Sequence, residues 1–285
     1  METVYGKAIA DEITEGVKAA AENLKMFGER PAKLAIVRVG DRPGDVSYEK
    51  GAAKRMEKCG ILCEMHDFPE TVDESEFLRE FGYINVDRSV DGILVLRPLP
   101  RSLEEKTVEL LDAGKDVDCM KPDNLGRLIS TRKRLFAPCT ALAVEKTIRY
   151  IMKEKGESLK GKKVTIIGRS AVVGRPLGLL LLSDDATVTV CHTKTRNLAD
   201  ECRNADIIVA AAGHAGLVGR DFVKPDAVVI DVGVNLGADG KLTGDVKADE
   251  LSDIPGTLTP VPGGVGAVTT SVLASQVMRA RLVYN

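Results

Sequence analysis

The segment at residues 164–176 has residue types and spacing suited to binding a phosphate group. An apolar run is followed by Gly168, and Gly174 comes six residues later. Glycines at a strand-to-helix turn let the main chain approach a pyrophosphate, and the N–H groups that begin the helix attract its negative charge. Ser170 and Val173 stand where the common GxGxxG pattern has its second and third glycines. The segment therefore indicates a dinucleotide site, and by itself it also fits a plain tight turn.

The residues that follow the next expected strand indicate which dinucleotide would bind. At this place an acidic residue commonly bridges the ribose hydroxyls of a cofactor that lacks the 2′-phosphate. Here the strand ends at His192 and Thr193 without a carboxylate, and Arg169 offers a positive charge from the preceding turn. We therefore favour NADP over NAD. The alternative reading makes Arg169 a solvated turn residue and Thr193 a helix cap.

Helices and strands must position these turns, and the hydrophobic pattern predicts where these helices and strands lie. Apolar residues at three- and four-residue steps predict an amphipathic helix over residues 8–25. Further strands and helices then alternate along the chain: strands at 34–39, 61–66, 92–96, 164–167, 187–191, 207–211 and 228–231, and helices at 46–59, 74–81, 103–111, 140–155, 176–182 and 269–283. Such alternation requires mostly parallel sheets covered by helices, because each crossover must return along the sheet. Two α/β units are the simplest account.

Composition excludes several classes of function. The 285 residues are 44% hydrophobic, which is enough for a substantial core, and the net charge of -2 leaves no basic field for nucleic acid or an anionic membrane. No apolar run approaches the roughly 20 residues that cross a bilayer. The six cysteines lack the paired spacing of a structural zinc site. We expect a cytoplasmic protein with reduced thiols and no metal.

Seven sequence blocks resemble, in order and over nearly the full length, the methylenetetrahydrofolate dehydrogenase/cyclohydrolase family, often called the FolD type. The blocks are Gly92 to Val95 with Pro98-Leu99-Pro100, Lys115-Asp116-Val117-Asp118, Pro138-Cys139-Thr140, Gly168-Arg169-Ser170 with Val173-Gly174-Arg175-Pro176, Ala186-Thr187-Val188-Thr189 with Cys191-His192, Ile230-Asp231-Val232-Gly233, and Thr259-Pro260-Val261-Pro262-Gly263-Gly264-Val265-Gly266.

The resemblance implies a fold and a reaction. It implies a folate-binding catalytic α/β domain at residues 1–141, on which the C-terminal helix at 267–285 packs, and a Rossmann-like NAD(P)-binding domain at 142–266, with a cleft between them and a homodimer as the usual assembly. The family oxidises 5,10-methylenetetrahydrofolate to 5,10-methenyltetrahydrofolate with a nicotinamide cofactor. Many members then hydrolyse the product to 10-formyltetrahydrofolate.

The resemblance also implies roles for individual residues. Tyr48 would be the catalytic platform against which the folate ring packs, and Asp118 would accept hydrogen bonds from the pterin amino and ring N–H groups. Without the family, Tyr48 reads as a half-buried aromatic and Asp118 as a loop cap. Substrate-contacting positions would further include Val95, Leu96, Arg97, Pro262, Gly263, Gly264, Val265 and Gly266. Cofactor-contacting positions would be Gly168, Arg169, Ser170, Gly174, His192, Thr193 and Val234.

Two departures from the family pattern bear on activity. The family carries a catalytic lysine one helical turn beyond the tyrosine, and this chain has Ala52 there. Lys50 lies on another face of the helix and Lys54 matches a different, non-catalytic lysine. The family's glutamine after the strand at 92–95 is replaced by Leu96. A glutamine left without the ammonium would cost about 1–3 kcal/mol as an unsatisfied buried group, so the two losses fit together.

These departures should affect the two reactions unequally. Hydride transfer chiefly needs two rings held face to face, whereas hydrolysis needs managed proton transfer, commonly worth about 10²–10⁴-fold. We expect a working dehydrogenase with weak or absent cyclohydrolase. The alternatives are a full bifunctional enzyme, a folate- or nucleotide-binding homologue without catalysis, and another hydride-transfer enzyme acting on a small carbonyl. Whether Arg55 or Arg97 replaces the lysine in part is open from the sequence.

Overall fold

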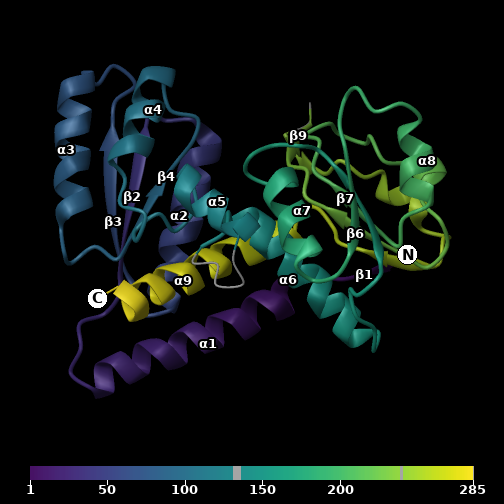
Figure 1. Cartoon of the computed structure of the whole chain (residues 1–285), viewed down its shortest axis with the longest axis horizontal. Coiled ribbons are helices and arrows are strands. Elements are labelled where there is room, and N and C mark those ends of the chain that lie inside the picture. The colour runs from purple at the N-terminus through teal and green to yellow at the C-terminus, as the bar shows by residue number, and fades with distance from the viewer. Residues whose placement is uncertain (131–135, 238–239, 285) are drawn as a thin grey trace. The chain divides into compact units, whose positions relative to one another are not determined.

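The computed structural model describes residues 1–130, 136–237 and 240–284, and its chain divides into two compact units. Unit 1 contains Met1–Ala10 and Thr140–Thr269, and unit 2 contains Asp11–Cys139 and Thr270–Asn285. The unit boundaries fall within or at the ends of three helices, α1 (Lys7–Met26), α6 (Cys139–Glu154) and α9 (Val265–Tyr284) (Figure 1). Each unit therefore contains segments that are distant in sequence.

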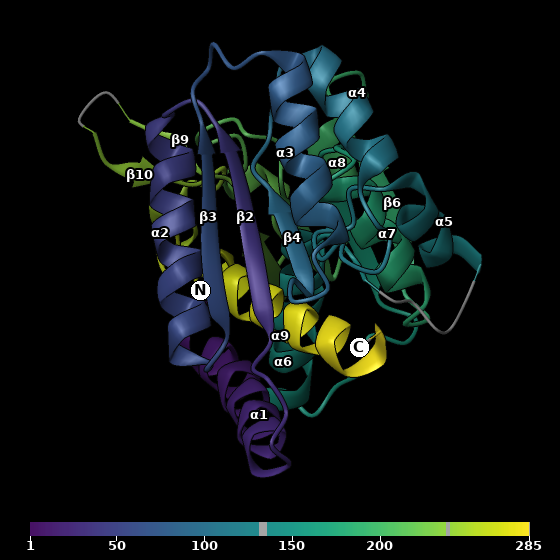
Figure 2. The same cartoon turned by 90° about the vertical axis from the view of Figure 1, so that its left-hand side faces the viewer.

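Unit 2 is built on a three-stranded parallel sheet in the order β3-β2-β4. The strands are β2 (Lys33–Val39), β3 (Leu62–Phe68) and β4 (Gly92–Val95), and the helices are α2 (Pro43–Lys58), α3 (Glu74–Val86), α4 (Arg101–Leu110) and α5 (Pro122–Ser130). The crossover through α2 connects β2 to β3, which pairs on one side of β2. The crossover through α3 connects β3 to β4, which pairs on the other side of β2. Right-handed crossovers in opposite directions place their helices on opposite faces of the sheet, as Figures 1 and 2 show.

One hydrophobic core cluster of unit 2 lies on the α3 side of this sheet. β2 is buried along its length apart from its first residue, as expected for a central parallel strand. Alternate residues of β2, beginning with Ala35, pack against Phe77 and Phe81 of α3, whose rings are stacked with centroids 6.0 Å apart. Leu103 of α4 completes the same cluster. This packing fixes the sheet's strand ends and therefore the loops that follow them.

Unit 1 is built on a six-stranded parallel sheet in the order β1-β11-β8-β7-β5-β6. Its strands are β1 (Glu2–Thr3), β5 (Lys163–Ile167), β6 (Thr187–Cys191), β7 (Ile207–Ala210), β8 (Ala227–Asp231) and β11 (Gly256–Leu258), with helices α7 (Gly174–Leu182) and α8 (Leu198–Arg203), 3-10 turns at Arg220–Phe222 and Ala248–Leu251, and a hairpin of β9 (Asn235–Leu236) and β10 (Leu242–Thr243). The strand order changes direction beside β5. Open parallel sheets bind ligands at such a switch point, outside the carboxyl ends of the strands.

The predicted α/β fold with parallel sheets is confirmed. Several short elements were not predicted, among them β1, β11, α5 and α8. Met1–Ala10 belong to unit 1 because β1 pairs with β11, and Met1 donates from its amino group to the carbonyl of Leu251 at 3.0 Å. None of the helices in the described ranges is long and apolar enough to span a bilayer.

Two buried carboxylates fasten the loops at the carboxyl edge of the unit 1 sheet. Asp231, at the end of β8, accepts N–H groups from Gly233 at 3.0 Å, Asp245 at 2.9 Å and Val246 at 3.0 Å. Asp245 in turn accepts main-chain N–H groups from residues 212, 213 and 214 and the side-chain amide of Asn235. The two aspartates are 4% and 0% exposed. They therefore tie the loops after β7, β8 and β10 to one another.

The burial of Asp231 changes its pKa. Burial raises the pKa of Asp231 to about 6, against the opposing effect of its three N–H donors and with a smaller addition from the negative charge of Asp245. Since the pKa is higher in the folded chain than the ordinary 3.8, the folded state binds this proton more tightly. The resulting stabilisation is fully present below pH 3.8 and is lost as the pH rises through 6.

We expect the Asp231→Asn variant to lose this pH dependence. Between pH 7 and pH 4 the free energy of unfolding of the wild type should gain on the order of 2–3 kcal/mol relative to the variant, measured by chemical denaturation. The exposed Asp221 of the same unit provides a control, and Asp221→Asn should leave the profile of the wild type unchanged. Parallel pH profiles for the wild type and Asp231→Asn would contradict the assignment.

Candidate functional site

The turn after β5 leaves no room for side chains at two positions. Gly168 has a φ of 130°, and a Cβ atom placed on it would lie 2.1 Å from the carbonyl oxygen of Ala211. A Cβ on Gly174 would lie 1.9 Å from the carbonyl oxygen of Gly168 itself. The first residue of α7 is thus pressed against the start of the turn. At both positions the crowding atoms are main chain and cannot move aside, and residues with side chains rarely adopt the φ of Gly168. Only glycine therefore fits at either position.

The rest of the turn is open and internally bonded. Ser170 accepts the N–H of Val173 through its Oγ at 3.0 Å and the N–H of Arg175 through its carbonyl oxygen at 3.1 Å. Arg169 and Ser170 are exposed. The turn therefore presents main chain, a hydroxyl and a guanidinium in front of the N-terminus of α7. Such a cradle suits the pyrophosphate of a dinucleotide, since a Cβ atom would fill the space where the main chain makes its close approach.

The other predicted cofactor residues follow neighbouring strands. His192 comes directly after β6, where its N–H donates to Thr195 Oγ1 at 2.9 Å, and Thr193 is exposed. Val234 follows β8 and is 66% exposed. Because parallel strands direct their carboxyl ends to one edge, the structure brings these residues to the same edge of the sheet as Gly168. No acidic residue directly follows β6 there.

The glycine-rich segment Pro262 to Gly266 reaches this edge as well, because it follows β11. Gly263 has a φ of 100° and accepts the N–H of Gly6 at 2.9 Å through its carbonyl oxygen. A Cβ on Gly264 would lie 2.5 Å from the carbonyl oxygen of Pro260. Pro262, Gly263 and Gly266 are exposed, whereas Gly264 and Val265 are buried. The exposed members can meet a ligand, and the buried ones anchor the start of α9.

In unit 2 the structure brings Arg97 and Asp118 together. Arg97 Nη2 donates to Asp118 Oδ2 at 3.2 Å, and the N–H of Cys139 donates to Asp118 Oδ1 at 2.9 Å. Cys139 is the first residue of α6, so the carboxylate meets the positive end of a helix. The Arg97 and Asp118 side chains are 23% and 21% exposed. The carboxylate is therefore fixed from two sides and still open to a ligand.

Tyr48 lies beside this carboxylate, in the second turn of α2. Burial of its ring raises the pKa of Tyr48 well above the usual value, and the Cys139 thiol and the negative charge of Asp118 add to the shift. The hydroxyl thus stays protonated at neutral pH. Together, Tyr48, Arg97 and Asp118 form what we call the carboxylate site: an aromatic ring, a cation and an anion within unit 2.

Gln276 supports the carboxylate site and was missed from the sequence. Its Nε2 donates to the carbonyl oxygens of Val117 at 2.6 Å and Ala137 at 2.9 Å, while its Oε1 accepts the N–H of Ala137 at 2.9 Å. Gln276 thereby links the segment just before Asp118 to the segment just before Cys139. A single amide within the otherwise small and apolar stretch at residues 271–278 was the available signal. Such a polar group, 4% exposed, needs internal partners.

The positions of the two family departures are apolar and buried. Ala52 is 0% exposed, Leu96 is 6% exposed, and Val95 belongs to the core cluster beside Phe77. Lys50 and Lys54 are exposed. Arg55 donates to Thr14 Oγ1 at 2.9 Å and to Thr270 Oγ1 at 3.4 Å. Of the two arginines considered from the sequence, Arg97 is the one paired with Asp118.

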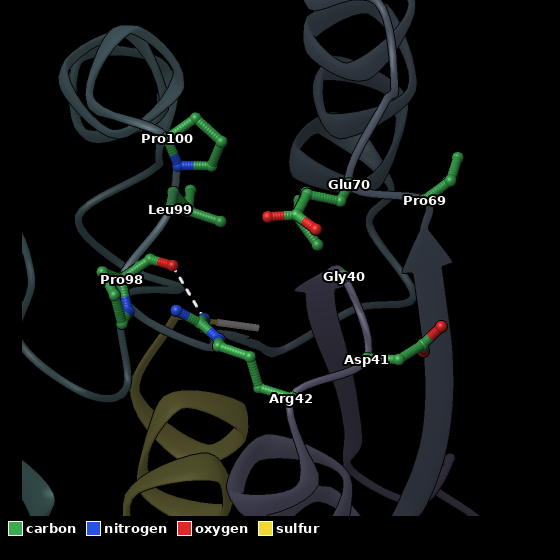
Figure 3. Close-up of a pocket in the computed structure, with 9 residues that line it drawn as sticks. Gly40, Asp41, Arg42, Pro69, Glu70, Pro98, Leu99 and Pro100 are labelled. Atoms are coloured by element: carbon green, nitrogen blue, oxygen red, sulfur yellow. Dashed lines mark hydrogen bonds between the residues drawn. The ribbon is translucent and has the colours of Figure 1, made fainter.

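A cavity of about 740 Å³ lies at the carboxyl ends of β2, β3 and β4 (Figure 3). Arg42 crosses it and donates from Nη2 to the carbonyl oxygen of Pro98 at 2.7 Å, while Glu70 directs its carboxylate inward. Pro98 follows Arg97, so the cavity adjoins the carboxylate site in sequence. No group of three or more His, Cys, Asp and Glu side chains suited to a metal ion occurs among the described residues.

Comparison with known proteins covers both units. Residues 4–118 match the family model described as tetrahydrofolate dehydrogenase/cyclohydrolase, catalytic domain, and residues 138–284 match its NAD(P)-binding domain. The bifunctional protein FolD of Alkaliphilus oremlandii is 45% identical over 282 residues, which are 98% of this chain and 97% of that protein. These matches span the Asp118 loop, the Gly168 turn and the segment at Pro262.

Solved structures agree with this relationship. The crystal structure of the bifunctional FolD enzyme from Campylobacter jejuni has a TM-score of 0.89 at 40% identity, with 97% of each chain covered. The FolD structure from Trypanosoma brucei, complexed with NADP and an inhibitor, has a TM-score of 0.90 at 32% identity over 99% of this chain and 98% of that one. With two family models matching most of its length, the chain belongs to the tetrahydrofolate dehydrogenase/cyclohydrolase family.

Proposed function

We propose that this protein oxidises 5,10-methylenetetrahydrofolate to 5,10-methenyltetrahydrofolate and passes the hydride to NADP. The observation that carries the proposal is the presence in one chain of two sites: a turn in unit 1 whose ends, Gly168 and Gly174, have no room for a side chain, and Asp118, a fixed carboxylate with open acceptor capacity, in unit 2. Membership in the family supplies the reaction class.

The residues of each unit would have separate tasks. In unit 1, Gly168 and Gly174 let the main chain approach the phosphates, and Ser170 and Arg169 offer a hydroxyl and a positive charge. When bound, the dinucleotide supplies the hydride acceptor. In unit 2, Asp118 would accept the pterin N–H groups and Tyr48 would provide an apolar surface for the ring. These tasks amount to binding and orientation, which is most of what hydride transfer demands of a protein.

The direct test is the absorbance at 340 nm with methylenetetrahydrofolate and each dinucleotide. We expect an increase with NADP that depends on both substrates. Binding of folate and dinucleotide without any turnover would instead support the ligand-binding alternative without catalysis. The small-carbonyl alternative would require turnover of a carbonyl compound that lacks the pterin.

We further propose that cyclohydrolase activity is weak. Ala52 and Leu96 supply no group that exchanges protons, and arginine is not a general acid or base in proteins. Hydrolysis would therefore lack a positioned acid or base at the place where the family has a lysine. The second candidate is the full bifunctional enzyme, which the names of the Alkaliphilus and Campylobacter relatives favour.

We expect the wild type to hydrolyse methenyltetrahydrofolate about 10²–10⁴-fold more slowly than it oxidises methylenetetrahydrofolate. Restoring the pair in Ala52→Lys/Leu96→Gln should raise the hydrolysis rate, followed as loss of methenyl absorbance. Ala53→Lys, one position along the same helix, is the matched control and should not raise it. Comparable hydrolysis and dehydrogenase rates in the wild type would refute this part of the proposal.

The preference for NADP is proposed from Arg169 and from the lack of a carboxylate directly after β6. A guanidinium near the ribose would bind the 2′-phosphate by charge-assisted hydrogen bonds. Arg169→Ala should therefore raise the KM for NADP about tenfold or more and leave the KM for NAD nearly unchanged. The exposed Lys160 of the same unit serves as control. An equal effect of Arg169→Ala on both cofactors would contradict the proposed role.

We also propose a cytoplasmic homodimer, as the family resemblance implies. The six cysteines are free, as in a reducing compartment. β3 is an edge strand whose Leu62 and Met65 are 52% and 45% exposed, and such edges commonly pair or are covered. Analytical ultracentrifugation should give a dimer at micromolar concentration, and Met65→Lys should shift it towards monomer. A monomeric wild type over this range would contradict the assembly.

A further inference from the structure

The ion pair of Arg97 and Asp118 has much unused hydrogen-bonding capacity. Within the described part of the chain, Arg97 donates one hydrogen bond, from Nη2, so most of its five N–H groups remain available. Each oxygen of Asp118 accepts one donor and can accept another. The neighbouring Arg42, by contrast, uses Nε for Asp45 at 2.7 Å and Nη2 for the carbonyl of Pro98. In these bonds Arg42 uses two of its nitrogens, whereas Arg97 uses one and is the arginine that lies against Asp118.

The pair offers acceptors and donors side by side. Asp118 presents carboxylate oxygens, and Arg97, 3.2 Å away, presents N–H groups. One edge of a pterin carries the complementary sequence: the 2-amino group and N3–H donate, and the adjacent 4-oxo group accepts. A carboxylate can satisfy the two donors, but as an acceptor it offers no hydrogen to the 4-oxo oxygen. The adjacent guanidinium supplies the missing donor.

No other polar group is evident at the positions where the family pattern has one. Ala52 and Leu96 are apolar, and both are buried. Tyr48 has a hydroxyl, but the negative charge of Asp118 acts on it and favours keeping its proton. A buried carbonyl without a donor is costly, so a folate bound here gains most from Arg97.

Resting on the proposed function, we propose that Arg97 is a specificity-determining residue that reads the 4-oxo group of the pterin while Asp118 reads the 2-amino group and N3–H. The site would then select 2-amino-4-oxo pteridines over 2,4-diamino pteridines. In a diamino compound the 4-position carries a donor, which would face the donors of Arg97. Specificity of this kind rests on an unpaired polar contact in the rejected ligand.

The test compares two probes that differ at one position, folic acid and its 4-amino-4-deoxy analogue, by calorimetric titration of the full-length chain. The wild type should bind the 4-oxo compound at least about tenfold more tightly. Arg97→Leu should weaken 4-oxo binding about tenfold or more and bring the ratio of the two affinities to one or below. Arg97→Lys, which keeps a charged donor, should restore part of the preference.

Controls separate this role from general damage. Arg79→Leu changes a solvent-exposed arginine on α3 and should leave both affinities as in the wild type. NADP affinity and circular dichroism should be unchanged in every variant. The proposal is overturned if Arg97→Leu weakens both probes by the same factor, if it keeps the preference, or if the wild type binds neither probe. Absence of dehydrogenase turnover with a normal, Arg97-dependent affinity ratio would instead refute the proposed function alone.

Discussion

Parallel pairing of strands decides where the functional residues of this protein lie. In unit 1, β5 pairs in parallel with both β6 and β7, so the turns that follow these strands open at one edge of the sheet. In unit 2, β2 pairs in parallel with both β3 and β4, which brings the loops at Arg42, Glu70 and Pro98 around one cavity. Loops gathered at such an edge expose many main-chain N–H groups. The buried pair Asp231 and Asp245 accepts six such donors in unit 1, together with the side-chain amide of Asn235.

The carboxylate site illustrates how a chain can lose one polar pair and keep a usable polar surface. If Ala52 and Leu96 stand where the family has a lysine and a glutamine, as the resemblance implies, the joint replacement leaves no orphaned partner in the interior and costs little stability. The cation of Arg97 directly follows Leu96 after β4 and is more exposed than Leu96, at 23% against 6%. A guanidinium recognises shape and charge but does not exchange protons. Under the proposed function, the site would contribute recognition and orientation, and proton transfer would be the part that it lacks a group to perform.

Long periodic elements were predictable from sequence, and small long-range contacts were not. The helix at residues 8–25 and the buried strand at 34–39 were recovered to within a residue or so, because hydrophobic periodicity is local. The turn at Gly168 was located because its glycines are required by local crowding. β1 is only two residues long and forms through pairing with β11, whose residues lie more than 250 positions away in the sequence. The roles of Asp231, Asp245 and Gln276 also depend on hydrogen bonds to other loops, up to 15, 33 and 159 positions away in the sequence, which no local pattern encodes.

The contact between Gly174 and the carbonyl of Gly168 has a consequence for how this region can change over time. It closes a short ring of main chain whose circumference is set by the five residues in between. Adding or deleting one residue would push the two glycines out of contact, whereas exchanging the exposed Arg169 or Ala171 would not. Natural variation should therefore change the exposed residues of this loop while its length stays constant. Cofactor preference can then change without any change in the sheet.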